Sequence, residues 1–223
     1  MTRQRALIPA GLLAGLLANY WLLEGALAER TDPIGSWVSD LGARSEEHAL
    51  VFDLLDGAAG LAIVLLALLL WRPLASRSRT LRLGVVALLA LGVCGVIDAA
   101  FPLSCAETLQ PGCQLDYDLV DVVHAAENVL AVLLTAAAFG LLGVGMRDEQ
   151  DLRSAGTATL ALGAAWLVLT AIMGSQFVIP AMDDVKGLFQ RLSQIVIGIW
   201  FVALAAGVRR SGGGSGPWSR SAR

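Results

Sequence analysis

Six long apolar segments constrain the fold of this chain more than any other feature of its sequence. They cover, approximately, residues 7–27, 50–71, 82–103, 119–145, 154–180 and 190–208. A helix needs about 20 predominantly apolar residues to cross the hydrocarbon core of a bilayer, and each segment is long enough. Backbone groups in lipid must be hydrogen-bonded within their own segment, which only a helix achieves here. The sequence therefore predicts an all-α membrane protein, a bundle of six transmembrane helices.

Composition supports this class and argues against others. Hydrophobic residues make up 56% of the 223 residues and charged residues only 16%, whereas soluble domains carry about 25% charged residues. The formal net charge of −3 gives no reason to expect nucleic-acid binding. We expect one transmembrane domain over residues 1–210, in contact with the lipid bilayer. Residues 211–223 are rich in Gly and Ser and are predicted to form a disordered tail.

The distribution of Lys and Arg predicts the orientation. Twelve of the 16 basic residues lie before the first segment, after the second, after the fourth, or after the sixth. The remaining four are Arg30, Arg44, Lys186 and Arg191. Loops rich in Lys and Arg stay in the cytoplasm, so both termini are predicted to be cytoplasmic. We expect a multi-pass protein of the plasma membrane, with its third loop outside the cytoplasm.

The first segment allows a second interpretation. Ala26–Ala28 resembles a signal-peptidase site that follows a basic start and an apolar stretch. However, this stretch is longer than the usual 7–15 residues, and polar residues such as Asn19 and Glu24 interrupt its end. We therefore expect a retained first helix. Cleavage after Ala28 would leave five spans in the same orientation.

The three cysteines divide into a pair and a single residue. Cys105 and Cys113 lie in the predicted outer loop, which has no Lys or Arg. In an oxidising compartment this pair is predicted to form a disulfide, the alternative being two free thiols. A catalytic redox pair is disfavoured because the chain has no C-x-x-C motif. Cys94 lies in the middle of a span and is expected to pack as a small core residue.

Ionisable and amide side chains gather in the predicted outer halves of the spans. A charged side chain at the centre of a bilayer costs about 2.5–3.5 kcal/mol on insertion scales, so this grouping is informative. The set consists of Asp53, Asp56, Asp98, Asp121, His124, Glu127, Asn128, Gln176 and Gln194. At 100° per residue, Asp121, His124 and Asn128 share one face of their helix. That face is predicted to point into the bundle, where Arg191 is the nearest expected cation.

These residues are assigned candidate roles. The predicted catalytic residues are Asp53, Asp98, Asp121 and His124. A predicted substrate pocket comprises Asp56, Glu127, Asn128, Gln176 and Gln194. Like charges at close range cannot all stay ionised, so either some carboxyls are protonated or a cation lies among them. In a competing interpretation, residues such as Asp53, Asp118 and Asp121 simply favour helix N-termini.

The same residues raise the question of a cofactor. A divalent metal could be held by His48, His124 and Asp121, although the chain has only two histidines and no H-x-x-x-H or H-E-x-x-H motif. A haem between His48 and His124 is disfavoured, because it requires two helices that face each other at matched depth. The cofactor therefore stays unassigned, with a divalent metal as the open alternative.

Three stretches carry a family resemblance. They are SDLGARSEEHALVFDLLDGAAG at 39–60, DAAFPLSCAETLQPGC at 98–113 and DLVDVVHAAENVL at 118–130. Together they resemble a bacterial and archaeal membrane family called domain of unknown function 998, over roughly residues 10–208. The resemblance implies a small helical membrane protein and assigns no activity. It draws attention to His48, Asp98, Pro102 and His124.

Two functional hypotheses follow. In the first, the protein is a membrane-embedded enzyme whose outward-facing carboxylate and histidine site acts on a lipid or another amphiphile, for example by acid chemistry of the terpene-cyclase kind. In the second, it is not an enzyme but a small transporter subunit, a cation-binding module or an envelope interaction partner. Transporters often show inverted repeats, and no such repeat is evident here. The enzyme needs converging side chains around a pocket, whereas the second hypothesis does not.

Overall fold

The computed structural model describes residues 2–28, 32–113 and 118–213, and every structural statement below refers to these residues. They form helices and turns, with no strand among them. The long helices are α1 (Thr2–Leu17), α3 (Ala49–Leu70), α4 (Arg79–Ala100), α5 (Leu119–Asp148), α6 (Arg153–Gly174) and α7 (Lys186–Gly213). The short helix α2 (Glu24–Leu27) follows α1 after a 3-10 turn, Tyr20–Leu23. The predicted all-α class is confirmed.

Five helical segments are long and apolar enough to cross a membrane. They are Ala49–Ala75, Arg79–Ala100, Leu119–Asp148, Arg153–Phe177 and Pro180–Ser211. A sixth span results if Gln4–Leu17 and Tyr20–Leu27 are counted together, because these two helices are bent by 56° at their junction. Asn19 lies at the bend, where its side-chain amide donates to the carbonyl of Gly15 at 2.8 Å. The predicted first span therefore corresponds to two helices joined at a bend, and the described residues form five or six candidate spans according to how this pair is counted.

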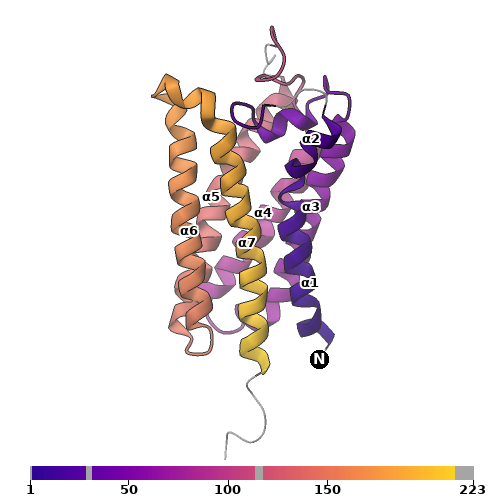
Figure 1. The fold of residues 1–223 in the computed structure, drawn as a ribbon. Helices are drawn as coiled ribbons and strands as arrows, with labels where there is room; N and C mark the ends of the chain where they lie inside the picture. The colour runs from indigo at the N-terminus through magenta and orange to yellow at the C-terminus, as the bar shows by residue number, and fades with distance from the viewer. Residues whose placement is uncertain (1, 29–31, 114–117, 214–223) are drawn as a thin grey trace, which may run out of the picture.

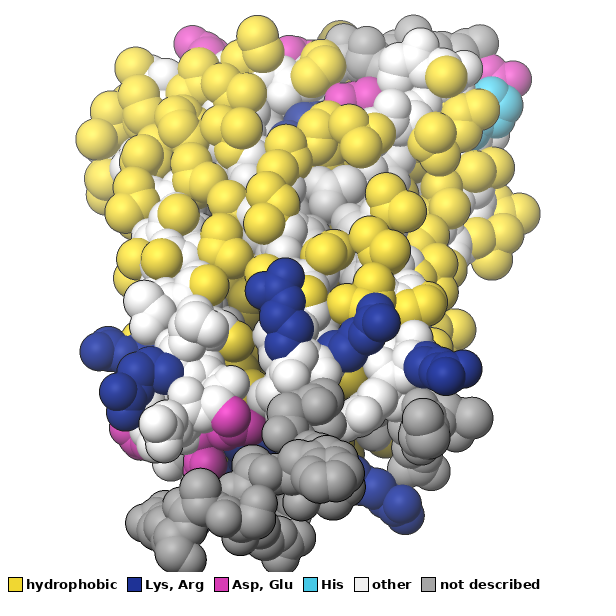
Figure 2. Space-filling view, turned by 60° about the horizontal axis from the view of Figure 1, so that its bottom comes forward, with side chains coloured by type: hydrophobic (Ala, Val, Ile, Leu, Met, Phe, Trp, Pro, Cys, Tyr) yellow, Lys and Arg dark blue, Asp and Glu magenta, His cyan; other side chains and the backbone are white. Residues whose placement is uncertain are grey.

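The long helices form a closed ring. Each of α3 to α6 packs against the next long helix along the chain, and α1 closes the ring against both α7 and α3. The start of α1 and the end of α7 lie at the same end of the bundle (Figure 1). We call this the basic end, because Lys and Arg side chains gather there below a belt of hydrophobic side chains (Figure 2). The first and the last long helix therefore have their chain termini at the basic end. That the basic end faces the cytoplasm stays a prediction.

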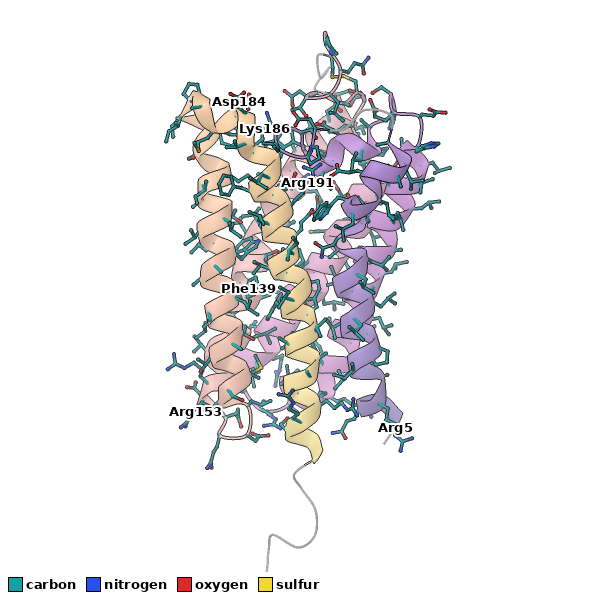
Figure 3. All side chains as sticks on the ribbon, in the orientation of Figure 1. Arg5, Phe139, Arg153, Asp184, Lys186 and Arg191 are labelled. Carbon is teal, nitrogen blue, oxygen red and sulfur yellow. A yellow bond between two sulfur atoms is a disulfide. The ribbon has the colours of Figure 1, made fainter. Side chains whose placement is uncertain are left out.

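The core is densest in the basic half and in the middle of the ring. Phe139 stacks against Trp200 with ring centroids 4.0 Å apart and against Trp166 at 5.8 Å; Figure 3 shows Phe139 at mid-height. Gly60 allows a close helix crossing, because a Cβ added to it would lie 2.7 Å from the Gly92 carbonyl oxygen. Gly140 makes no such approach, because nothing lies within 4 Å of a Cβ at that position.

The opposite end, which we call the outer end, is covered by loops and short helices. The disulfide between Cys105 and Cys113 is present, as predicted. Asp118 caps α5 by accepting hydrogen bonds from the backbone of Val120 and Asp121, so the helix-terminus interpretation holds for this residue. At the other end of the chain, α7 continues to Gly213, into the segment predicted to be a disordered tail. The rest of that segment lies outside the described residues.

Candidate functional site

A cavity of about 230 Å³ lies inside the ring, between the dense core and the outer end. Its lining changes in chemistry along the bundle axis. The part nearer the outer end, which we call the polar wall, carries Tyr20, Asp56, Asp98, Glu127, Asn128 and Gln194. The deeper part is formed by apolar side chains such as Ile63, Leu91, Trp166 and Phe201. A space with one polar and one apolar part has the chemistry of an amphiphile-binding site.

Asp98 of α4 and His124 of α5 form the central pair of the polar wall. Nδ1 of His124 lies 2.8 Å from Oδ1 of Asp98, and the His124 side chain is only 8% exposed. Asp98 lines the cavity, whereas His124 lines a much smaller adjoining space of about 10 Å³ behind it. The sequence predicted both as catalytic residues. The structure brings them together, with Asp98 at the cavity and His124 beside it in the smaller space.

Further carboxyl groups surround this pair. Glu127 is 8% exposed, lines the cavity, and lies within hydrogen-bonding reach of Asp98. Asp56 lines both spaces, and Asp53 lines the smaller one. All four carboxyls interact electrostatically with one another in the interior, where repulsion between like charges is poorly screened. The predicted gathering of these residues is therefore a feature of the structure.

Arg191 does not compensate this negative charge. Its guanidinium binds Glu24 of α2 in a bidentate ion pair, with N–O distances of 3.0 and 2.6 Å. It also donates to the backbone carbonyls of Ser36 and Gly187 at 2.8 and 3.2 Å. The expectation that Arg191 is the cation of the carboxyl cluster is therefore wrong. Within the described residues, the charged groups that oppose the cluster are His124 and, near Asp53, Arg44.

Asp121 belongs to the outer loop. Its two carboxylate oxygens accept hydrogen bonds from the backbone N–H and the hydroxyl of Ser104, at 3.2 and 3.1 Å. It is 2% exposed and lines neither the cavity nor the smaller space. Although it shares a helix face with His124, it lies one turn nearer the loop and holds that loop against α5. The structure therefore separates Asp121 from the other predicted catalytic residues.

The remaining predicted pocket residues divide in the same way. Asn128 and Gln194 line the cavity. Gln176 lies elsewhere, in a polar depression at the outer end together with Trp37, Asp183 and Lys186, part of which Figure 3 shows through Asp184 and Lys186. Gln176 follows the last turn of α6, in a short 3-10 helix. The direction of its side chain could therefore not be predicted from helical periodicity.

The predicted metal ligands are not brought together. Across residues 2–28, 32–113 and 118–213, no group of three or more His, Cys, Asp and Glu side chains is arranged to hold a metal ion. His124 is bound to Asp98 and Asp121 to Ser104, while His48 immediately precedes α3 as its N-cap residue. The three side chains chosen from the sequence thus have separate surroundings.

The sequence analysis did not assign Tyr20 to the pocket. Tyr20 lines the cavity and lies within hydrogen-bonding reach of Asp56. Gln190 lines it as well, and its Oε1 accepts the backbone N–H of Val38 at 2.7 Å. Tyr20 is placed by the bend after α1, which turns the chain across the outer end. A polar residue beside Asn19 in an otherwise apolar span was the available signal.

Comparison with protein-family models gave one result that covers most of the chain. Residues 9–207 match the model described as "Protein of unknown function (DUF998)". Neither the curated proteins nor the solved structures gave a match. The matched range runs from within α1 to within α7 and includes every residue of the polar wall. This chain therefore belongs to the DUF998 family.

Proposed function

We propose that this protein is a membrane-embedded enzyme that carries out acid–base chemistry on an amphiphile held in the cavity. The observation that carries this proposal is the pairing of a buried carboxyl, Glu127, with a half-buried one, Asp98, at the polar wall of a space that is apolar at its deeper end. Such a cavity receives a polar group and an apolar chain at the same time. We further propose that this end of the bundle faces away from the cytoplasm, because the Lys and Arg residues gather at the other end.

The two carboxyls have different partners, which suggests different roles. His124 contacts Asp98 at 2.8 Å, whereas Glu127 lies beside Asp98 itself, so we assign the role of base to the carboxyl that His124 contacts. Pairs of titratable groups in unlike surroundings are the usual arrangement of a general acid and a general base. Glu127 is then the acid and Asp98 the base, with His124 positioning and stabilising the base.

A redox-neutral rearrangement follows from these roles. Glu127 gives its proton to one atom of the substrate, for example an alkene carbon or an oxygen, and a new C–H or O–H bond forms. Asp98 takes a proton from another atom of the same molecule, whose bonding electrons complete the new double bond. The proton then passes from Asp98 to Glu127 across their hydrogen bond, so the site returns to its starting state. The reaction needs only groups that this chain supplies.

The test is to incubate the purified protein, in mild detergent and in heavy water, with a lipid extract of the membranes in which it was produced. We expect a product that is an isomer of one amphiphile and that has gained deuterium, because the Glu127 proton exchanges with solvent. Glu127→Gln and Asp98→Asn should abolish the product, while Asp148→Asn, an exposed change at the basic end, should not.

Formation of the same product by the Glu127→Gln and Asp98→Asn proteins would contradict the proposed acid and base. An amphiphile that copurifies with the protein but is never converted would contradict the enzyme and favour the alternative, a non-enzymatic binding protein. Mass spectrometry of the extracted lipid separates these outcomes, since it reports both retention and isotopic composition.

A further inference from the structure

The wall of the cavity between α5 and α6 differs between its two halves. In the basic half the two helices are in tight contact: a Cβ added to Gly143 would lie 2.6 Å from the Leu160 side chain, and one added to Gly163 would lie 2.9 Å from Phe139. Phe139 and Trp166 pack across the same interface with ring centroids 5.8 Å apart. These contacts close the floor of the cavity.

Nearer the outer end, residues of the same two helices line the cavity. Asn128 and Val132 of α5 both line it, yet both are exposed, Val132 by 38%. On the α6 side, Thr170 and Met173 line it and are half-buried. A residue that lines an internal cavity and is also exposed marks a place where the wall is incomplete. The four residues therefore frame an opening between α5 and α6.

This opening lies in the side of the bundle and not at its outer end. Asn128 lies nine residues beyond the start of α5, which is about 14 Å along the helix axis, and Val132 lies deeper still. Both therefore lie within the span Leu119–Asp148. Their neighbours Val129 and Leu133 are 64% and 60% exposed, as expected for side chains that contact lipid. The opening thus leads sideways out of the bundle.

We propose that this opening is the lateral entrance of the site, and that the substrate is an amphiphile with a small polar group and a long apolar chain that enters from the bilayer. The inference rests on the proposed function. A cavity of about 230 Å³ is smaller than the roughly 300–1,000 Å³ of sites that enclose a whole drug-sized ligand. The polar group fills the cavity beside Asp98 and Glu127, while the chain passes between Asn128 and Met173 into the bilayer.

An unsatisfied polar atom at the polar wall agrees with this placement. Oε1 of Gln194 is buried and finds no hydrogen-bond partner among the described residues. Gln194 lines the cavity. Buried polar atoms are almost always hydrogen-bonded in native proteins, so this acceptor indicates that the occupant supplies a donor. A hydroxyl or amino group at the head of the amphiphile meets that requirement.

The experiment uses the full chain in phospholipid vesicles and a long-chain alcohol that carries an alkyl diazirine next to its hydroxyl group. Illumination converts the diazirine into a carbene that inserts into adjacent side chains, and peptide mass spectrometry locates the adduct. We expect adducts at Glu127 in the wild type. Val132→Trp fills the opening and should lower this labelling several-fold. Leu133→Trp adds the same bulk one residue away, on the lipid-facing side, and should leave the labelling unchanged.

A second blocking variant controls for the possibility that Val132→Trp lowers the labelling by misfolding. Thr170→Trp closes the opening from α6 and should give the same loss, while Val132→Ala widens it and should keep or increase the labelling. Wild-type labelling at Glu127 in both Trp variants would overturn the lateral entrance and leave the proposed site intact. Absence of any Glu127 adduct in the wild type would overturn both the entrance and the proposed function.

Discussion

Nδ1 of His124 on α5 lies 2.8 Å from Oδ1 of Asp98 on α4, and the two side chains are 8% and 21% exposed. The contact crosses the interface between two adjacent spans at the level of the cavity. Glu127, the other carboxyl at this interface, lies within hydrogen-bonding reach of Asp98. The contact with His124 therefore gives two neighbouring carboxyls different surroundings.

The ion pair between Glu24 and Arg191 should be important for stability. Arg191→Met leaves Glu24 buried without a counter-charge and should lower the free energy of unfolding by about 3–5 kcal/mol. The double variant Glu24→Leu/Arg191→Met should recover much of this loss, because no unpaired charge remains. Denaturant unfolding in detergent micelles measures both.

The matched control for this ion pair is at the basic end. Arg77 pairs with Asp151 at 2.7 Å, but the two side chains are 28% and 43% exposed. The hydrogen bond from Arg77 lowers the pKa of Asp151. Because exposed pairs contribute about 0–1 kcal/mol, Arg77→Met should have a small effect. If Arg77→Met and Arg191→Met lowered the free energy of unfolding equally, the claim that burial makes the Glu24–Arg191 pair important would be contradicted.

Asp40 should make stability depend on pH. Burial raises the pKa of this carboxyl, although Thr108 and the backbone N–H of Trp37 donate hydrogen bonds to it. The folded protein then binds the proton of Asp40 more tightly than the unfolded chain. Its contribution to stability is therefore most favourable below the ordinary carboxyl pKa of about 3.9 and declines as pH rises through the raised value.

The measurement is the melting temperature of the wild type and of Asp40→Asn across the acidic range. As pH rises, the wild type should lose stability relative to the variant, because only the wild type pays for the buried charge. The exposed change Asp148→Asn serves as the control and should give a constant difference. A constant difference for Asp40→Asn as well would show that Asp40 does not titrate differently in the folded protein.

Gly60 should tolerate no side chain. A Cβ at this position would lie 2.7 Å from both the Gly92 carbonyl oxygen and the Val96 nitrogen of α4, so Gly60→Ala must push α3 and α4 apart. We expect a loss of about 1–3 kcal/mol. Gly140→Ala, where nothing lies within 4 Å, should be neutral or stabilising by up to about 1 kcal/mol through helix propensity. Unfolding experiments that rank the two variants equally would contradict the close crossing.

The helices could be predicted because apolar length alone decides whether a segment spans a membrane. The partners of the polar residues could not, because they depend on which helices become neighbours. Arg191 pairs with Glu24 across 167 residues of sequence, and no local pattern connects the two. Asp121 and His124 share a helix face but lie at different depths. Asp121 therefore binds the outer loop, whereas His124 contacts Asp98. The bend at Asn19 likewise follows from a side-chain hydrogen bond that helical periodicity does not show.

The orientation is testable on its own. A reporter that is active only in the cytoplasm should be active when fused after Arg210. The same reporter inserted between Ser104 and Asp118 should be inactive, because the disulfide loop is expected outside the cytoplasm. The inverse pattern would contradict both the orientation and the outward position of the cavity's polar wall.

The central claim is that Asp98 and Glu127 form one coupled site and that Asp121 is not part of it. A double-mutant cycle of unfolding free energies in detergent tests this most directly, with Asp98→Asn combined in turn with Glu127→Gln and with Asp121→Asn. Residues in contact show couplings of about 0.5–3 kcal/mol, and we predict a value in this range for Asp98 with Glu127. For Asp98 with Asp121 we predict additivity within about 0.5 kcal/mol. Additivity between Asp98 and Glu127, or strong coupling to Asp121 alone, would contradict the account.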